Sequence, residues 1–169
     1  AIAIAKHLGI DDEKIKSAVA SFAGVKRRFE YIVRTSSLVY IDDYAHHPEE
    51  LRALITGAKA MYPSKKCTII FQPHLFTRTR DLADGFAASL DLADEIVLLP
   101  IYPARELPIE GVNSEMIMQR MKGKVVLKNK NELEALMLEM QNSTMLLYYF
   151  KGNFTLHTAT GAEICPCGA

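Results

Sequence analysis

Hydrophobic positions recur along the chain at two spacings, and together they predict helices alternating with strands. Between residues 15 and 22 they return every three or four positions, which places them on one face of a helix. Asp11 can cap the first turn of this helix, and Gly24 lies near its end. A second helix is expected to begin at Pro48, because proline suits a first helical turn and the acids Glu49 and Glu50 favour its positive end.

Short β-rich runs separate the helical stretches. Residues 29–33 and 38–41 predict two strands or a hairpin, since only a few small polar residues lie between them. Further along, strands are expected at residues 67–71, 95–99, 124–127 and 144–150, and helices at about 80–90, 114–121 and 131–141. Asn131 and Glu134 match a capping box for the last helix. This alternation predicts an α/β fold, with a mostly parallel sheet and helices on both faces.

Length and charge then narrow the class of protein. A chain of 169 residues with 49% hydrophobic and 24% charged residues fits one globular domain. Its 20 basic and 20 acidic residues give a net charge of zero, so we expect neither nucleic acid nor an anionic membrane as a partner. No apolar run reaches the ~18 residues of a membrane span and no secretory signal begins the chain, which makes the cytoplasm the expected location.

Ala1 begins the chain without an initiator methionine, and we expect a fragment of a longer protein. The chain lacks a Gly-x-x-x-x-Gly-Lys-Ser/Thr loop, so another domain would have to hold the phosphates if ATP is used. Cys67 lies in an apolar run and is expected to be a small buried residue. Cys165 and Cys167 offer only two closely spaced thiols, too few to predict a zinc site.

Three polar clusters stand where strands or domains are expected to end, at residues 26–30, 42–48 and 71–81. The basic first cluster could simply be solvated surface. In the second, the adjacent Asp42 and Asp43 repel each other and desolvate poorly, and the histidines that follow could form hydrogen bonds or cap a helix. In the third, Arg78 and Arg80 flank an expected strand-to-helix turn, where they and free backbone N–H groups could bind a carboxylate or phosphate. An arginine-rich surface turn is the alternative.

These clusters share their residues and their order with a known family. They read GVKRRF at 24–29, DDYAHHP at 42–48 and FQPH at 71–74 followed by TRTRD at 77–81, with weaker support from YPA at 102–104. Over about residues 1–143 the chain resembles the C-terminal domain of the Mur ligases, most closely of the members that add L-alanine. The resemblance implies a Rossmann-like domain, with residues 1–24 at the junction with an absent central ATPase domain.

The resemblance also implies a reaction of peptidoglycan synthesis. ATP phosphorylates the carboxylate of UDP-N-acetylmuramate, and the amine of L-alanine attacks the acyl phosphate. ATP and magnesium would be the cofactors, with the phosphates and the metal held mainly by the central domain. L-alanine, ATP and UDP-N-acetylmuramate would be the partners of the full-length protein. The fragment alone is therefore expected to be inactive.

Three motif positions are assigned to the nucleotide by this resemblance. Arg28 matches an arginine that reaches the ATP phosphates, a role that suits a guanidinium during phosphoryl transfer. Asp43 matches an aspartate that accepts hydrogen bonds from the ribose. Tyr44 would lie beside the adenine, where an aromatic ring can stack.

Four further positions are assigned to the incoming amino acid. His46, His74 and Arg78 match positions around it, and Arg78 is best suited to bind its carboxylate at two points. Arg80 is the reserve candidate for that contact. Leu75 departs from the pattern, because several relatives have an arginine there, and one anion contact is absent or replaced. Residues 144–169 depart further, and we regard them as an atypical tail.

Other functions remain open at this point. A recycling ligase that attaches a whole tripeptide to the same sugar nucleotide shares the second motif but differs at residues 71–80. A phosphoacceptor receiver domain also carries paired acids after its first core strand, but it needs an aspartate where Gln72 and Pro73 stand. A passive nucleotide-binding module is the third alternative.

Overall fold

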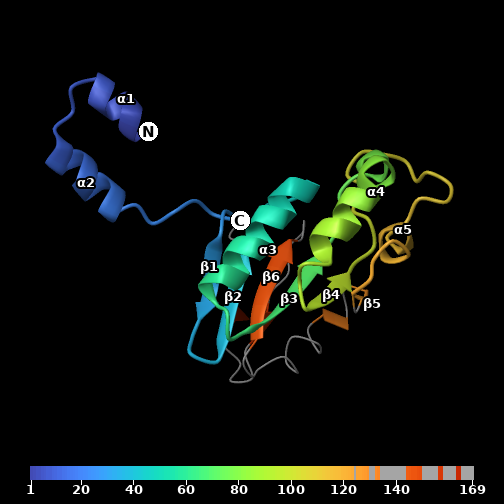
Figure 1. The fold of residues 1–169 in the computed structure, drawn as a ribbon. Coiled ribbons are helices and arrows are strands. Elements are labelled where there is room, and N and C mark those ends of the chain that lie inside the picture. Colours follow the sequence, from blue (N-terminus) through green and yellow to red (C-terminus); the bar gives the residue numbers. More distant parts are fainter. Residues whose placement is uncertain (124, 130–131, 134–143, 150–155, 158–162, 165–169) are drawn as a thin grey trace.

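The core of the protein is a six-stranded sheet. The computed structural model describes residues 1–123, 125–129, 132–133, 144–149, 156–157 and 163–164. The sheet has the order β1-β2-β6-β3-β4-β5, with strands β1 Glu30–Arg34, β2 Leu38–Asp42, β3 Lys66–Phe71, β4 Glu95–Leu98, β5 Val125–Leu127 and β6 Thr144–Tyr149 (Figure 1). β1 pairs with β2 as an antiparallel hairpin, and the other four pairings are parallel. The prediction of a mostly parallel sheet is confirmed.

The last long strand lies inside this sheet. β6 pairs with β2 on one side and with β3 on the other. The strand expected at residues 144–150 is therefore confirmed, and it joins two strands that lie far earlier in the chain. A separate two-stranded pair is formed by β7 Leu156–His157 and β8 Glu163–Ile164.

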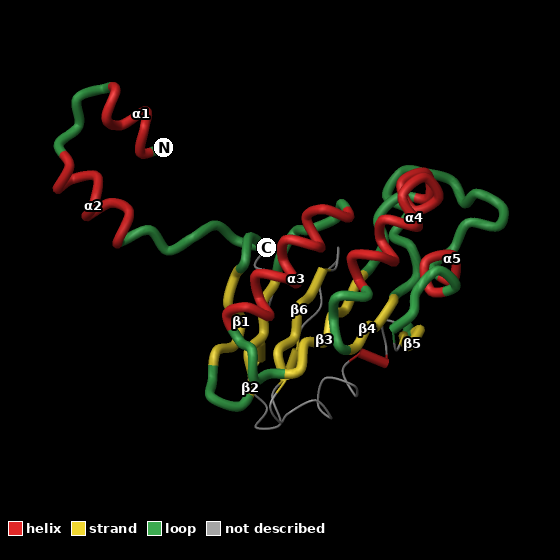
Figure 2. The backbone as a smooth tube through the Cα atoms, viewed as in Figure 1, coloured by secondary structure: helices red, strands yellow, loops and turns green. Residues whose placement is uncertain are grey.

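Two long helices, α3 Pro48–Met61 and α4 Phe76–Leu90, lie side by side on one face of the sheet (Figure 2). α3 begins where expected, with a capping box formed by His47 and Glu50. Gly85 allows α4 to approach it, because a Cβ atom there would lie 3.0 Å from Cγ of Pro48. The helix expected at residues 131–141, with its capping box, lies outside the described residues apart from 132–133.

Two helix boundaries differ from the prediction. α4 begins four residues before the expected residue 80, and α5 Glu115–Met118 ends three residues before the expected residue 121. α5 ends early because the carboxylate of Asp91 accepts the backbone N–H groups of Lys122 at 3.0 Å and Gly123 at 2.9 Å, which turns the chain toward β5. The early start of α4 follows from a contact with a distant loop, described below.

The sheet is buried on both faces. On the helical face, Ile69 and Phe71 pack in one cluster with Leu51 of α3 and Phe86 of α4. On the opposite face, Tyr40, Ile70 and Val97 are at most 4% exposed. Such strands are typical of parallel sheets, and each fully buried aliphatic or aromatic side chain contributes about 1.5–3 kcal/mol. Cys67 is fully buried in β3, as its apolar run predicted.

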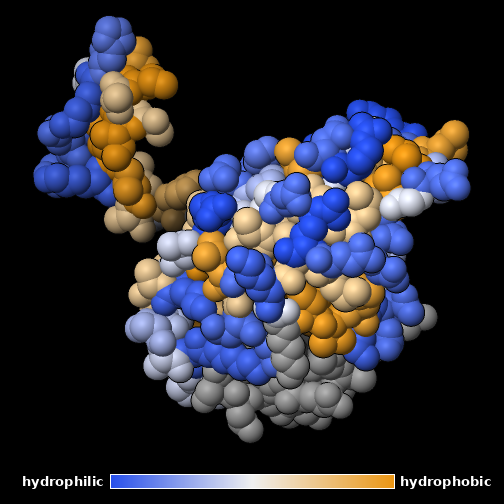
Figure 3. Space-filling view, turned by 45° about the vertical axis from the view of Figure 1, so that its right-hand side comes forward, coloured by the Kyte–Doolittle hydropathy of each residue, from blue (hydrophilic) through white to orange (hydrophobic). Residues whose placement is uncertain are grey.

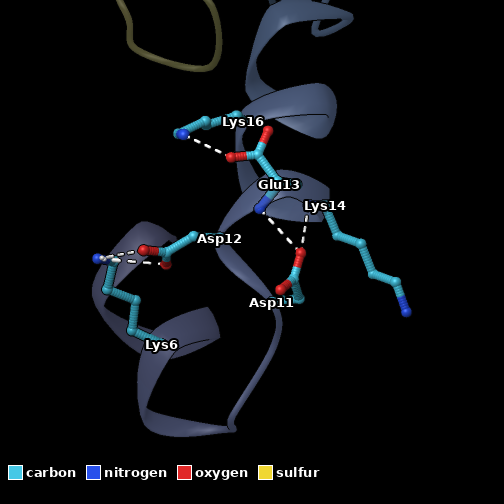
Figure 4. Close-up of polar contacts among 6 residues, drawn as sticks. All are labelled: Lys6, Asp11, Asp12, Glu13, Lys14 and Lys16. Carbon is cyan, nitrogen blue, oxygen red and sulfur yellow. Dashed lines mark hydrogen bonds and ion pairs between the residues drawn. The ribbon is translucent and has the colours of Figure 1, made fainter.

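The N-terminal helices α1 Ile2–His7 and α2 Asp12–Ala20 lie apart from the sheet (Figure 1). Asp11 caps α2 as expected, because its carboxylate accepts the N–H groups of Glu13 at 2.9 Å and Lys14 at 3.4 Å (Figure 4). This contact thus fixes the start of α2. We call residues 1–24 the N-terminal arm, and one side of it is polar (Figure 3).

The other side of this arm is apolar and exposed. Figure 3 shows a hydrophobic strip along it. Ile15 is buried, but large side chains around it are 44–69% exposed, namely Ile2, Ile4, Leu8, Ile10, Val19 and Phe22. A contiguous apolar surface of this kind is typical of an interface. None of the described helices has the length and apolar character needed to cross a membrane.

Candidate functional site

Polar side chains gather where β2 and β3 end. Because both strands are parallel to β6, their carboxyl ends lie at the same edge of the sheet, separated by that strand. Ligands of parallel α/β sheets bind at this edge. The residues form two groups, which we call the β2 cluster (Arg27, Arg28, Asp42, Asp43, Tyr44, His46 and Glu50) and the β3 cluster (His74, Thr77, Arg78, Tyr102 and Glu106).

A strained turn carries the arginines of the β2 cluster. Arg27 and Phe29 have φ angles of 58° and 52°, in the left-handed region that side chains other than glycine rarely adopt. Each such residue costs on the order of 1–3 kcal/mol and persists where its surroundings fix it. The backbone N–H of Tyr44 donates to the carbonyl oxygen of Arg27 at 2.8 Å, which ties the turn to the end of β2. Arg28 is held between the two strained residues and is exposed.

Asp43 is the acceptor that fixes this turn. Its Oδ2 atom accepts the backbone N–H of Phe29 at 2.7 Å, and its Oδ1 atom accepts that of Ala45 at 2.8 Å. A carboxylate can accept about four hydrogen bonds, so one further position remains on each oxygen. Asp43 can therefore brace the turn and still accept a hydroxyl group from a ligand.

The ring of Tyr44 lies beside both arginines. The guanidinium carbons of Arg27 and Arg28 are 5.2 Å and 5.4 Å from its centroid, within the range of cation–π attraction. The ring of His46 meets it edge-on at 5.0 Å. The structure thus brings together Arg28, Asp43 and Tyr44, the three residues that the motifs assigned to a nucleotide.

His46 belongs to the β2 cluster and is tied to the start of α3. Its backbone N–H donates to Oε2 of Glu50 at 2.9 Å, and its Nδ1 atom lies 2.8 Å from the carbonyl oxygen of Tyr44. Burial alone would raise the pKa of Glu50, but the N–H groups of His46 and His47 and the nearby charges of His46 and Arg28 lower it. The assignment of His46 to the surroundings of an amino-acid substrate, together with His74 and Arg78, stays a prediction.

In the β3 cluster, His74 stacks on Tyr102. Their rings are 5.7 Å apart with an interplanar angle of 11°. The two segments also exchange backbone hydrogen bonds, from Tyr102 N–H to Pro73 at 2.8 Å and from Leu75 N–H to Tyr102 at 3.0 Å. The loop that follows β4 therefore lies directly along the segment that carries His74.

The strand-to-helix turn before α4 is already occupied by an acid. Glu106 accepts the backbone N–H of Thr77 at 3.0 Å and its hydroxyl at 2.6 Å. These two hydrogen bonds, the hydroxyl first, lower the pKa of Glu106. The expectation of free backbone N–H groups at this turn is wrong for Thr77, because its N–H donates to Glu106. The sequence did not reveal that Glu106 would lie at this turn.

Arg78 and Arg80 have different surroundings. Arg78 is half-buried, and its Nη1 atom is buried without a hydrogen-bond partner among the described residues. Arg80 is exposed, and its Nε atom lies 2.7 Å from Oδ1 of Asp81. Because a buried donor gains most from an anionic partner, Arg78 is the better placed of the two.

Two residues of the site were missed from the sequence. Glu50 was taken only as an acid of a first helical turn, and Glu106 was not singled out. A weak signal for Glu106 exists, since it follows the YPA element at residues 102–104 that already supported the resemblance. In the part of the chain that is described, no group of three or more His, Cys, Asp or Glu side chains is arranged to hold a metal ion.

The sequence of the chain was compared with protein families and with known proteins. The family model for the Mur ligase, glutamate ligase domain, matches residues 27–149. UDP-N-acetylmuramate–L-alanine ligases from Flavobacterium johnsoniae and Parabacteroides distasonis are 53% and 55% identical to the chain over 121 and 120 residues. These alignments cover 72% and 71% of this chain but 27% and 26% of the relatives, so the chain spans about a quarter of their length.

A solved structure of a related ligase has a similar fold. The UDP-N-acetylmuramate-alanine ligase of Thermotoga maritima aligns with a TM-score of 0.72 and 30% identity, covering 89% of this chain and 32% of that one. The match of the family model extends to residue 149, the end of β6, six residues beyond the motif resemblance. The chain belongs to the Mur ligase family and contains its glutamate ligase domain.

Proposed function

We propose that this chain is the C-terminal domain of an ATP-dependent ligase that joins L-alanine to UDP-N-acetylmuramate in peptidoglycan synthesis. The observation that carries the proposal is its 53–55% identity to relatives named for that activity. Since the chain spans about a quarter of their length, the phosphate-binding loop belongs to the rest of the full-length enzyme. We expect the reaction to take place in the cytoplasm, because it consumes ATP that is supplied there.

In this reaction a carboxylate is activated before the amide forms. The γ-phosphoryl group of ATP is transferred to the carboxylate of UDP-N-acetylmuramate, which leaves ADP and an acyl phosphate. The amine of L-alanine then attacks the acyl carbon and expels inorganic phosphate. Bound magnesium, held mainly by the central domain, would supply neutralisation of the phosphate charge. The role of the present domain is to bring the nucleotide and the amine into line, and such orientation contributes several kcal/mol to a two-substrate reaction, roughly 7–11 at its upper range.

The β2 cluster binds the nucleotide in this proposal. Arg28 is exposed beside Tyr44 and can extend toward the phosphates. Asp43 keeps one acceptor position on each carboxylate oxygen for the ribose hydroxyls. Tyr44 provides an aromatic surface for adenine, in competition with the arginine side chains that lie beside it. Nucleotide binding would thus release Arg28 from the ring as the adenine approaches.

The β3 cluster binds the amino acid. Arg78 binds the carboxylate of L-alanine at two points, supported by its buried Nη1 atom. His74 is held in place by stacking on Tyr102, and His46 approaches from the β2 cluster. Arg80 takes the carboxylate only if it leaves Asp81. Leu75 offers no charge in this turn, which leaves Arg78 as its principal cation.

The N-terminal arm forms the junction with the ATPase domain. Residues 1–24 carry the exposed apolar strip, which includes Ile4, Leu8 and Phe22 at 66–69% exposure. An exposed apolar surface of this kind stabilises the protein when another domain buries it. Packing of the strip on the ATPase domain would fix the distance between the strained turn at Arg28 and the phosphates.

A steady-state assay of the full-length enzyme tests the proposal. Release of ADP and phosphate should require both UDP-N-acetylmuramate and L-alanine, and the product should contain one new amide bond by mass spectrometry. If the tripeptide L-alanyl-γ-D-glutamyl-meso-diaminopimelate replaces L-alanine as the required acceptor, the protein is instead a recycling ligase. ATP binding without any acceptor-dependent turnover would favour a passive nucleotide-binding module.

A further inference from the structure

The first turn of α4 takes its acceptor from a loop almost thirty residues away. Its N-cap residue, Leu75, provides no side-chain cap, although the first N–H groups of a helix need acceptors. Glu106 supplies an acceptor through its hydrogen bonds to the N–H and hydroxyl of Thr77. Arg78, the proposed ligand of the substrate carboxylate, directly follows Thr77 in the chain, so the acidic cap contacts the residue before it.

The loop that carries Glu106 is fastened on both sides of this contact. Gln72 donates its side-chain N–H to the carbonyl oxygen of Pro100 at 3.1 Å, and Tyr102 exchanges backbone hydrogen bonds with residues 73 and 75. Ala104 has a φ of 52°, and the N–H of Glu106 then donates to Pro103 at 2.9 Å. A strained turn of this kind persists because its surroundings determine it. Glu106 is therefore directed toward α4 by a specific loop conformation.

We infer that Glu106 is a positioning residue that directs the carboxylate of the amino-acid substrate onto Arg78, an inference that rests on the proposed function of that arginine. Free N–H groups at a helix N-terminus bind anions. Here the carboxylate of Glu106 already fills that position, and its charge repels a second anion from it. The donor left for the substrate is the guanidinium of Arg78, with its buried Nη1 atom. The substrate carboxylate thus has one binding position, which sets the position of its amine.

The test uses the full-length enzyme with Glu106→Gln and Glu106→Ala. The first keeps the size of the side chain and removes its charge, and the second frees the N–H groups. Both should lower kcat with L-alanine about tenfold without raising its KM, because part of the bound L-alanine then holds its carboxylate away from Arg78 and its amine is misplaced. The KM for ATP should stay within about twofold. Acetate, a free carboxylate, should become a stronger competitive inhibitor against L-alanine. Glu110→Gln, an exposed acid on the same loop, is the matched control and should behave as the wild type.

A third variant leaves the charge of Glu106 in place. Thr77→Val removes the 2.6 Å hydroxyl contact to Glu106 but leaves the backbone N–H, so it should give the same selective fall in kcat with L-alanine at about two- to fivefold. It reports on the contact even if the Glu106 variants fold poorly. Rescue of kcat with L-alanine by Glu106→Asp is not expected, since the shorter side chain cannot span both Thr77 groups.

The outcomes separate this inference from the proposed function. If the Glu106 and Thr77 variants lose thermal stability but the folded enzyme keeps a normal kcat with L-alanine and normal acetate inhibition, Glu106 is a helix cap and nothing more, and the inference is overturned. Arg78→Lys in the same assay tests the arginine itself. A raised alanine KM in Arg78→Lys, with normal kcat and acetate inhibition in the Glu106 variants, overturns the inference alone. A normal alanine KM and turnover in Arg78→Lys overturns the proposed carboxylate site.

Discussion

The Nε atom of Arg27 lies 3.3 Å from Oδ2 of Asp42, a carboxylate whose side chain is only 1% exposed. Burial raises the pKa of Asp42 to about 6, and the charge of Arg27 opposes that shift without cancelling it. The pair joins the strained turn to the last residue of β2. Protonation of Asp42 therefore changes the electrostatics of the turn that carries Arg28.

The first prediction concerns this pair and pH. Because the folded-state pKa of Asp42 is above its ordinary value of 3.8, the folded protein binds the proton more tightly than the unfolded chain does. The stability that this provides is complete below pH 4 and is lost as pH rises through about 6. Asp42→Asn mimics the neutral form, so its Tm relative to the wild type should rise by about 5 °C between pH 4 and pH 7.

Thermal melts of the isolated chain at several pH values measure this difference. Asp81→Asn is the control, because Asp81 is exposed and hydrogen bonding to Arg80 lowers its pKa. That variant should show no change relative to the wild type between pH 5 and pH 7. A constant difference between Asp42→Asn and the wild type across the range would contradict the assigned proton affinity.

The second prediction separates the two roles of Asp43. Asp43→Asn keeps one acceptor oxygen but places an amide against an N–H donor, so Tm should fall, by an amount equivalent to about 1–3 kcal/mol. If the carboxylate also binds ribose, the KM for ATP in the full-length enzyme should rise about tenfold or more, and the KM for L-alanine should not. An enzyme with lower Tm and unchanged ATP dependence would show that Asp43 is only a brace.

The third prediction concerns the arginines of α4. Arg78→Lys keeps the charge and loses the planar fork, so it should reduce alanine-dependent turnover more than ATP affinity. Arg80→Lys is the matched control two residues away, and its kinetics should stay close to those of the wild type because Arg80 is directed to Asp81. The assignment is reversed if Arg80→Lys shows the larger alanine defect.

The fourth prediction is that the isolated chain folds but does not turn over ATP. Its buried sheet and the α3–α4 layer should give a cooperative thermal transition. Chelator-sensitive phosphate release by the pure chain, measured against a buffer blank, would show that the phosphate-binding machinery lies within it.

The exposed apolar side of the N-terminal arm predicts in addition that Phe22→Ser lowers self-association of the isolated chain, as light scattering can measure.

The fifth prediction concerns Cys67. Burial raises the pKa of its thiol to about 12, with the charge of Asp94 adding to the shift. In the native chain Cys67 should resist alkylation at pH 8, and it should react fully after denaturation in guanidinium chloride. Peptide mass mapping after alkylation measures the modification at this residue. Rapid native labelling would mean that β3 opens easily.

Much of the local structure was readable from the sequence alone. The cap at Asp11, the start of α3 at Pro48 and the strands around residues 38–41 and 67–71 depend on neighbours within about four positions, and the chain order shows these directly. The motifs also pointed to the segments that form the β2 cluster, apart from the role of Glu50, because its other members come from two short segments with conspicuous charge. Such features are local, so hydrophobic period and capping chemistry suffice to predict them.

Other features were decided by tertiary structure. The place of β6 between β2 and β3 depends on pairings with segments 106 and 78 residues earlier in the chain. The contact of Glu106 with Thr77 joins a loop to a helix across 29 positions. It was this contact that moved the start of α4 to Phe76 and filled the turn that had been expected to bind an anion. Hydrogen bonds between distant groups have no periodicity in the sequence. They form because buried or terminal N–H groups must find acceptors, and only the folded chain determines which acceptor is near.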